Sequence, residues 1–235
     1  MRANRAETVV FEPMKTLWLV GGGLEAVPAV KRAKELGLHV AVSDYNPRAP
    51  ALVLADDRIP VSTYDVEATV AAALAYSREV RTIDGVTCVA TDVPLTVAAV
   101  AQALNLPGIP LEAARLASDK LAMKERLVAS GLAVPWFHPV ESAAHLASLV
   151  RERGCPLVVK PVDSRGARGV LRLVAGIDLN WAYGVAQSQS PTGRVMVEEF
   201  SEGPQISTEA VLLSGRGYTL GLSDRNYELW ETFSP

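Results

Sequence analysis

The first hundred residues alternate short apolar runs with amphipathic segments, and this alternation constrains the fold more than any other feature of the sequence. Apolar runs predict strands at 16–20, 39–43, 57–61 and 85–90. The patterns between and after them predict helices at about 25–36, 66–77 and 94–104. Continuously apolar strands separated by helices form parallel sheets that are covered on both faces. With right-handed crossovers, this segment is predicted to be a doubly wound, Rossmann-like α/β domain.

The Pro- and Gly-rich stretch at residues 106–110 marks the end of this domain. A long helical pattern over 111–129 follows, and then strands and helices no longer alternate regularly. Further strands are predicted at 136–140, 157–160, 170–174, 194–199, 206–213 and 218–223, with helices at 143–153 and 179–188. We therefore expect an α/β domain over 14–110 and an α+β domain over 111–235. Residues 1–13 are interpreted as an upstream extension or a frayed tail.

Charge and cysteine content restrict the partners and the compartment. Lys plus Arg number 23 and Asp plus Glu number 26, a net charge of −3, so no basic excess indicates a nucleic-acid or membrane partner. No apolar stretch approaches the ~18 residues of a membrane span. Cys88 and Cys155 both lie in apolar runs, which favours reduced core thiols and a cytoplasmic protein.

Lys160 stands at the end of an apolar run and is followed at once by a loop rich in glycine and arginine, residues 164–169. A lysine ammonium at a fixed strand end suits an oxygen shared between phosphates. Gly166 and Gly169 permit conformations that turn successive N–H groups inward, which forms an anion-binding concavity. The sequence therefore predicts a polyphosphate site here, with a solvated hairpin turn as the alternative.

Two further segments suit a nucleotide. Lys120, on a predicted helix, is a second candidate phosphate ligand, with a solvated helix lysine as the alternative. An apolar strand runs into a polar hinge at 198–205, whose C=O and N–H groups could bind the edge of a purine. Val158 and Val197 would sandwich the ring. An acidic strand end is the alternative interpretation of the hinge.

Lys120, Lys160 with its loop, and the run at 198–201 together resemble the ATP-grasp superfamily. The preceding domain, with its segments at 21–23 and 91–92, resembles the pre-ATP-grasp domain of carbamoyl-phosphate synthase large subunit and biotin carboxylase. Together with the apolar neighbour, the resemblance gives a predicted nucleotide-binding set: Lys120, Val158, Lys160, Ser164, Arg165, Gly166, Ala167, Arg168, Gly169, Glu198, Glu199, Phe200, Ser201 and Gln205.

The resemblance also implies a role for each part of this set. The two lysines hold the phosphates of ATP, and the loop covers them. The Glu198 side chain and the Glu199 carbonyl face the adenine amino group, and the Ser201 amide faces a ring nitrogen. Gln205 occupies a position at which some members carry a ribose-binding Glu. A glutamine can still bond a hydroxyl, but it brings no charge.

ATP-grasp enzymes generally phosphorylate a carboxylate to an acyl phosphate, which an amine or similar nucleophile then attacks. The resemblance thus implies an ATP-dependent ligase of the carboxylate–amine or carbamoyl-phosphate-synthase-like type. Its cofactors would be ATP and Mg²⁺, and its substrates a small-molecule carboxylate and an amine. The second domain would be a partial ATP-grasp domain, with an A subdomain at about 118–194 and the start of a B subdomain at about 195–235.

The end of the sequence departs from the family pattern. ATP-grasp enzymes place their Mg²⁺-binding carboxylates well beyond the adenine hinge, whereas the segment after Gln205 offers only Asp224, Glu228 and Glu231. We therefore expect a chain that is truncated at its C-terminus, with its metal ligands in a missing segment and no metal ligand assigned. Arg225 is the candidate catalytic residue at the phosphate end of the site, with a strand-end salt bridge as the alternative.

Other functions stay open at this point. A non-catalytic nucleotide-binding fragment would use the same residues. An NAD-dependent oxidoreductase would use the turn at 21–23 and Asp44, although Ala26 stands where a third glycine is expected. Asp92 is a candidate for an acceptor pocket, with a helix N-cap as the alternative. An open sheet edge would allow a homodimer. The acceptor substrate is not indicated by the sequence.

Overall fold

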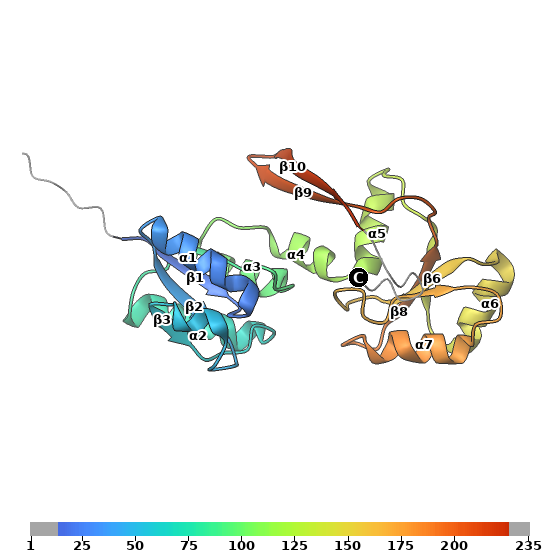
Figure 1. The fold of residues 1–235 in the computed structure, drawn as a ribbon, viewed down its shortest axis with the longest axis horizontal. Coiled ribbons are helices and arrows are strands. Elements are labelled where there is room, and N and C mark those ends of the chain that lie inside the picture. Colours follow the sequence, from blue (N-terminus) through green and yellow to red (C-terminus); the bar gives the residue numbers. More distant parts are fainter. Residues whose placement is uncertain (1–13, 226–235) are drawn as a thin grey trace, which may run out of the picture. The chain divides into compact units, whose positions relative to one another are not determined.

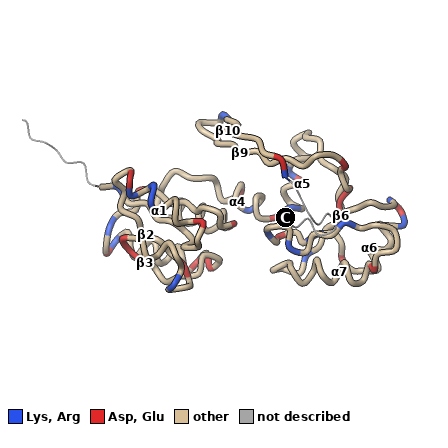
Figure 2. The backbone as a smooth tube through the Cα atoms, in the orientation of Figure 1, with Lys and Arg blue, Asp and Glu red and all other residues tan. Residues whose placement is uncertain are grey.

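The computed structural model describes residues 14–225, and the chain divides into two compact units, Met1–Ser118 and Asp119–Pro235 (Figure 1). The sequence boundary after residue 110 precedes α4 (Leu111–Ser118), which the structure groups with the first unit. Basic and acidic residues are interspersed along the described chain (Figure 2). Within residues 14–225, no helix has the length and apolar character needed to cross a membrane.

The first unit is a parallel sheet with helices on both faces. Its strands lie in the order β3-β2-β1-β4, and every pair is parallel. Its elements are β1 (Thr16–Val20), η1 (Leu24–Ala26), α1 (Val27–Glu35), β2 (His39–Ser43), η2 (Pro50–Val53), β3 (Asp57–Ile59), α2 (Val66–Glu79), β4 (Gly85–Thr87) and α3 (Pro94–Ala103). The predicted doubly wound fold is confirmed, although β3 and β4 are shorter than their apolar runs.

Alternating side chains of β1 explain why this strand is apolar throughout. Leu19 points to one face, where it packs with Val30 of α1. Trp18 points to the other face, where it packs with Tyr76 of α2 and Val100 of α3. Burying each such side chain contributes about 1.5–3 kcal/mol. Both layers of helices are therefore held to the sheet by the same five-residue strand.

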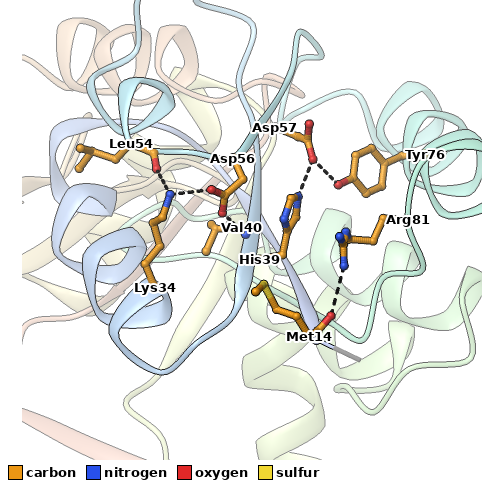
Figure 3. Close-up of polar contacts among 9 residues, drawn as sticks. All are labelled: Met14, Lys34, His39, Val40, Leu54, Asp56, Asp57, Tyr76 and Arg81. Atoms are coloured by element: carbon orange, nitrogen blue, oxygen red, sulfur yellow. Dashed lines mark hydrogen bonds and ion pairs between the residues drawn. The ribbon is translucent and has the colours of Figure 1, made fainter. Parts of the chain in front are cut away.

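Carboxylates close the end of this sheet at which β2 and β3 begin (Figure 3). Asp56 accepts a hydrogen bond of 2.9 Å from the Val40 N–H. Asp57 accepts one of 2.7 Å from the Tyr76 hydroxyl and lies 2.6 Å from His39 Nε2. The Tyr76 hydroxyl, together with His39, holds the pKa of Asp57 below its ordinary value. This end of the sheet is thus fixed by side chains, opposite the glycine-rich loop after β1.

Gly21 begins that loop, and its conformation and surroundings strongly favour glycine. Its φ is +100°, and a Cβ at this position would lie 2.7 Å from Thr91 Oγ1. Its N–H donates to the Ser43 carbonyl at 2.8 Å. Both the backbone conformation and the close approach of the neighbouring loop make a side chain here unfavourable.

The second unit contains a four-stranded antiparallel sheet in the order β5-β8-β6-β7 and a separate antiparallel hairpin of β9 and β10. Its elements are α5 (Lys120–Ala129), β5 (Phe137–Val140), α6 (Ala143–Arg153), β6 (Leu157–Pro161), β7 (Leu171–Leu173), α7 (Leu179–Ser188), β8 (Val195–Glu199), β9 (Ile206–Leu213) and β10 (Arg216–Asp224). The predicted α+β order and the predicted antiparallel pair are confirmed.

The long helix predicted over 111–129 is wrong, because the structure breaks it at Asp119. This residue has an extended backbone, with φ −126° and ψ 104°, and its side chain accepts a hydrogen bond from the Ala122 N–H. An aspartate at an N-cap satisfies a helix donor that would otherwise lack a partner. The cap therefore ends α4 and starts α5 at Lys120.

The two faces of the second sheet differ in what covers them. Val197 of β8 points to one face, where it packs with Leu146 of α6 and Ala182 of α7. Its neighbour Met196 points to the opposite face, against Leu121 of α5. Period-two alternation thus gives one closed apolar face and one face shared with α5. Polar side chains of β6 and β8 lie on the second face.

Both cysteines are free thiols. Cys88 is partly buried, whereas Cys155 is exposed. The prediction that both belong to the core is wrong for Cys155, because it lies in the turn between α6 and β6.

Candidate functional site

A cavity of about 680 Å³ opens in the second unit, on the side of the sheet that faces α5. Its walls come from α5, the strands β6 and β8, the loop after β6 and the hinge after β8. The lining residues are Lys120, Met123, Lys124, Pro135, Val158, Lys160, Gly166, Ala167, Val170, Glu198, Glu199, Phe200, Ser201, Glu202, Gly203, Pro204, Gln205 and Arg225. Most of the predicted nucleotide-binding set, and the candidate catalytic residue, therefore line one cavity.

Lys160 and Glu198 meet because β6 and β8 are antiparallel. Val158 lies opposite Glu198 and Lys160 lies opposite Met196, so Lys160 and Glu198 are diagonal neighbours on one face. The Lys160 ammonium is paired with Glu198 Oε1. The Lys124 ammonium lies 2.9 Å from Glu198 Oε2. One carboxylate is therefore held between two lysines.

Lys120 is held by hydrogen bonds of its own N–H and ammonium groups, and by an ion pair of the preceding residue, Asp119. The Lys120 N–H donates to the Val162 carbonyl at 3.0 Å, and its ammonium donates to the Ser164 carbonyl. Asp119, directly before it, pairs with Arg194. Burial raises the pKa of Asp119, but hydrogen bonds from the Ala122 N–H and from Arg194 outweigh burial and hold it below the ordinary value. The start of α5 is thus bonded to the loop after β6 through Lys120 and to the residue before β8 through Asp119.

The loop after β6 contributes backbone more than side chains. Gly166 and Ala167 both have positive φ, +57° and +56°, and both line the cavity. Arg165 and Arg168 are not among the lining residues, and neither are Ser164 and Gly169. The backbone of this loop, rather than the arginines, forms the wall in this structure.

The hinge after β8 supplies the far wall. The Glu199 N–H donates to the Trp136 carbonyl at 2.8 Å, which fixes where the strand ends. Phe200 lies 4.2 Å from the Arg172 guanidinium in a cation–π contact. The Gln205 carbonyl accepts a bond of 2.8 Å from the Arg225 N–H, so these two candidates are neighbours across the base of the β9–β10 hairpin.

The structure changes one part of the purine sandwich. Val158 lines the cavity as predicted. Val197, its expected partner, has no exposed surface and packs in the core on the opposite face. Strand alternation separates the two valines, because Val197 is adjacent to Glu198, which faces the cavity.

Several lining residues were missed from the sequence. These are Met123, Lys124, Pro135 and Val170, whereas Glu202, Gly203 and Pro204 belong to the predicted hinge without having been singled out. A helical spacing signal existed for Lys124, because residues four apart share a helix face and Lys120 was already a candidate. No comparable signal marked the others.

Of the two candidates in the first unit, Asp44 has an internal structural role and Asp92 is exposed. The Asp44 carboxylate accepts bonds of 2.8 Å from the Gly22 N–H and from the Asn46 N–H, so both oxygens serve the local loops. Asp92 is exposed, and the N-cap of α3 is Val93 with no side-chain cap bond. The N-cap interpretation of Asp92 is therefore wrong.

The metal ligands were expected in a missing segment, and the sequence after residue 223 offers only three carboxylate side chains. Asp224 ends β10 and is exposed, whereas Glu228 and Glu231 lie outside the described residues. Within residues 14–225, no group of three or more His, Cys, Asp or Glu side chains is placed to hold a metal ion.

Known proteins resemble the chain in sequence and in fold. Residues 30–108 match the ATP-grasp N-terminal domain. The uncharacterized protein y4rH of Sinorhizobium fredii is 31% identical over 193 residues, which cover 80% of this chain and 40% of that protein. The formate-dependent phosphoribosylglycinamide formyltransferase of Shewanella amazonensis is 29% identical over 187 residues, covering 77% and 46%.

A solved structure of N5-carboxyaminoimidazole ribonucleotide synthetase in complex with ADP superposes with a TM-score of 0.75 at 20% identity. The superposition covers 94% of this chain and 56% of that one. The chain thus carries an ATP-grasp N-terminal domain and has the fold of ATP-grasp enzymes, and the resemblance predicted from its sequence is confirmed. It spans less than half the length of the two curated relatives.

Proposed function

We propose that the second unit binds ATP in the cavity between α5 and the hinge, and that the chain is the nucleotide-binding part of an ATP-dependent ligase. The observation that carries this proposal is that Lys120, Lys160 and the 198–205 hinge, predicted separately, line one cavity. Relatives that depend on formate or form a carboxyamino product support a carboxylate as the activated group.

The cavity fits a nucleotide in size and charge. Its volume of about 680 Å³ lies within the usual range of small-molecule sites, roughly 300–1,000 Å³. Lys120 and Lys160 bring two candidate phosphate-binding ammonium groups to its wall, beside the loop after β6. Ammonium groups and inward backbone N–H groups are the ligands that phosphate oxygens prefer. This part of the cavity would take the triphosphate.

The cavity also offers surface for a purine. Val158, Met123 and Phe200 supply apolar side chains to its lining, and the hinge residues that line it carry backbone donors and acceptors. The predicted contacts of the Glu199 carbonyl and the Ser201 amide with the purine edge would orient the ring. Gln205 and Arg225 are neighbours at the base of the β9–β10 hairpin, line the cavity, and would face the ribose or the phosphates.

In the proposed reaction a carboxylate oxygen attacks the γ-phosphorus of ATP, and ADP leaves. The amine then attacks the carbonyl carbon of the acyl phosphate, and inorganic phosphate leaves. Carboxylate–amine ligation follows this scheme, and a carbamoyl-phosphate-synthase-like reaction follows it up to the carbamate, which a second ATP would then phosphorylate. Lys120 and Lys160 would neutralise the charge that develops on the transferring phosphoryl group.

Mg²⁺ is the metal that such a reaction implies, and it would neutralise phosphate charge when bound. Residues 14–225 place no carboxylate cluster that could hold it, so we derive no step through the metal from these residues. The binding proposal rests on the lysines and the hinge alone.

Calorimetric titration with ADP and ATP tests the proposal. We expect saturable binding, and Lys160→Ala should weaken it by about tenfold or more, because a fixed phosphate ligand is lost. Lys31→Ala is the matched control, since Lys31 is an exposed lysine on α1 and should leave the affinity unchanged.

Failure of the intact chain to bind either nucleotide would overturn the proposal, as would equal affinities for the Lys160→Ala and Lys31→Ala variants. ADP formation with candidate carboxylates and amines measures the ligase step separately from binding.

A further inference from the structure

Lys124 was assigned no role from the sequence, yet it is the most deeply buried lysine of the cavity. Only 11% of its side chain is exposed, against 16% for Lys160. Its ammonium lies 5.5 Å from the centre of the Phe137 ring, in a cation–π contact, and 2.9 Å from Glu198 Oε2. A buried ammonium is costly unless it is paired, so this placement needs a compensating partner.

Glu198 is that partner, and it is shared. The Glu198 side chain is 14% exposed and contacts Lys124 through one oxygen and Lys160 through the other. Lys160 is also the proposed phosphate ligand. A lysine cannot give its full charge to a phosphate while it remains the sole counter-ion of a buried carboxylate, because removing one partner of such a pair is strongly unfavourable.

We propose, on the basis of the proposed function, that Lys124 is a positioning residue that keeps Glu198 neutralised so that Lys160 can turn from Glu198 to a bound phosphate. Lys124 is suited to this because it is held from two sides. It is anchored on α5, and the Phe137 ring of β5 lies beside its ammonium. It therefore stays on Glu198 when Lys160 leaves.

The proposal predicts an effect that depends on phosphate. In Lys124→Met, Glu198 has only Lys160 as its counter-ion, so a phosphate must compete with a buried ion pair. ADP binding should weaken by about tenfold or more. Adenosine has no phosphate to draw Lys160 away, and its affinity should stay within about twofold of the unmodified protein. Lys124→Arg keeps the charge and should restore most of the ADP affinity.

Removing the carboxylate charge should rescue the defect. In the double variant with Glu198→Gln, Lys160 has no buried counter-ion to leave, so ADP binding should recover towards that of Glu198→Gln alone. Equal weakening of ADP and adenosine binding in Lys124→Met would overturn the proposal, because a residue that merely shapes the cavity would act on both ligands. Failure of the double variant to recover would overturn it as well.

A nucleotide-free measurement separates this proposal from the proposed function. An active ester can acetylate the Lys160 amine only when the Lys160 side chain has left Glu198. Peptide mass spectrometry measures the rate of this acetylation. Acetylation should slow several-fold in Lys124→Met and accelerate in Glu198→Gln, while acetylation of Lys31 stays constant. If Lys124→Met does not fold, the Glu198→Gln arm still decides. If neither Lys124→Met nor Glu198→Gln changes the rate of Lys160 acetylation, the proposal for Lys124 is overturned even where ADP binds. If both variants change that rate as expected but the protein does not bind ADP, only the proposed function is overturned.

Discussion

Arg194 and Asp119 are 75 residues apart in the sequence, and the structure places Arg194 Nη1 2.5 Å from Asp119 Oδ2. The other oxygen of Asp119 caps α5 through the Ala122 N–H at 2.9 Å. The Asp119 carboxylate therefore connects the residue before β8 with α5, the helix that carries Lys120 and Lys124. The position of two cavity lysines depends on this contact.

Asp119→Ala should lower both stability and nucleotide affinity. Loss of the cap is expected to cost about 0.5–2 kcal/mol in the free energy of unfolding, measured by urea denaturation. ADP affinity should fall because Lys120 is the first residue of α5. Asp178→Ala is the matched control, since Asp178 caps α7 through the Asn180 and Trp181 N–H groups, outside the cavity. Equal ADP affinities in the two variants would contradict this expectation.

Tyr76→Phe should change how stability responds to alkaline pH. Burial, together with the hydrogen bond to Asp57, raises the pKa of Tyr76 above its ordinary value. The folded state thus retains the phenolic proton that the unfolded chain loses, so stability should fall as pH rises above about 10. The variant should lack this fall. At neutral pH it should lose about 1 kcal/mol with the hydrogen bond.

Urea denaturation at several pH values measures the alkaline fall in stability and the loss at neutral pH, in the unmodified protein and in Tyr76→Phe. Tyr45→Phe is the control, because Tyr45 is 72% exposed. If the Tyr76→Phe variant keeps the full alkaline loss of stability, the Tyr76–Asp57 contact is not its source.

Gly21→Ala should destabilise the first unit by about 1–3 kcal/mol, because the residue combines a positive φ with a close approach. Gly37→Ala separates these causes. Gly37 also has a positive φ, +75°, but nothing lies within 4 Å of its Cβ position. Its substitution should therefore cost less. Thermal unfolding followed by circular dichroism compares the two, and equal losses would show that the contact with Thr91 is unimportant.

Gln205→Glu should strengthen the binding of nucleotides that carry ribose hydroxyls. A carboxylate accepts charge-assisted hydrogen bonds, which are roughly twice as strong as neutral ones. We expect an increase of a few-fold in affinity for ADP and none for 2′,3′-dideoxy-ADP. Calorimetric titration of both ligands gives the comparison. A parallel change for the two ligands would place Gln205 away from the ribose.

The strands of both sheets could be predicted because their cause is local. Residues 16–20 are apolar throughout since both faces of β1 are covered. The break at Asp119 could not be predicted in the same way. Residues 111–129 have an unbroken helical pattern. The Asp119 side chain, whose residue has an extended backbone, pairs with Arg194, which directly precedes β8. The helical pattern alone did not show that the Asp119 side chain would cap α5 instead of continuing one long helix.

The same distinction applies to the cavity. Lys160 and the hinge could be predicted because each ends an apolar strand. Lys124 resembles a solvated helix lysine, and only the pairing of β6 with β8 brings its counter-ion Glu198 beneath α5. Val197 was misplaced because the side of a strand that faces a ligand depends on the register, which neighbouring apolar residues do not reveal.

The alternation along β8 makes this strand intolerant of changes in length. One inserted residue before Val197 would exchange the two sides, driving a carboxylate among Leu146 and Ala182 and leaving a valine beside the lysines. We therefore expect β8 to tolerate an inserted residue poorly, because its two faces have opposite chemical requirements.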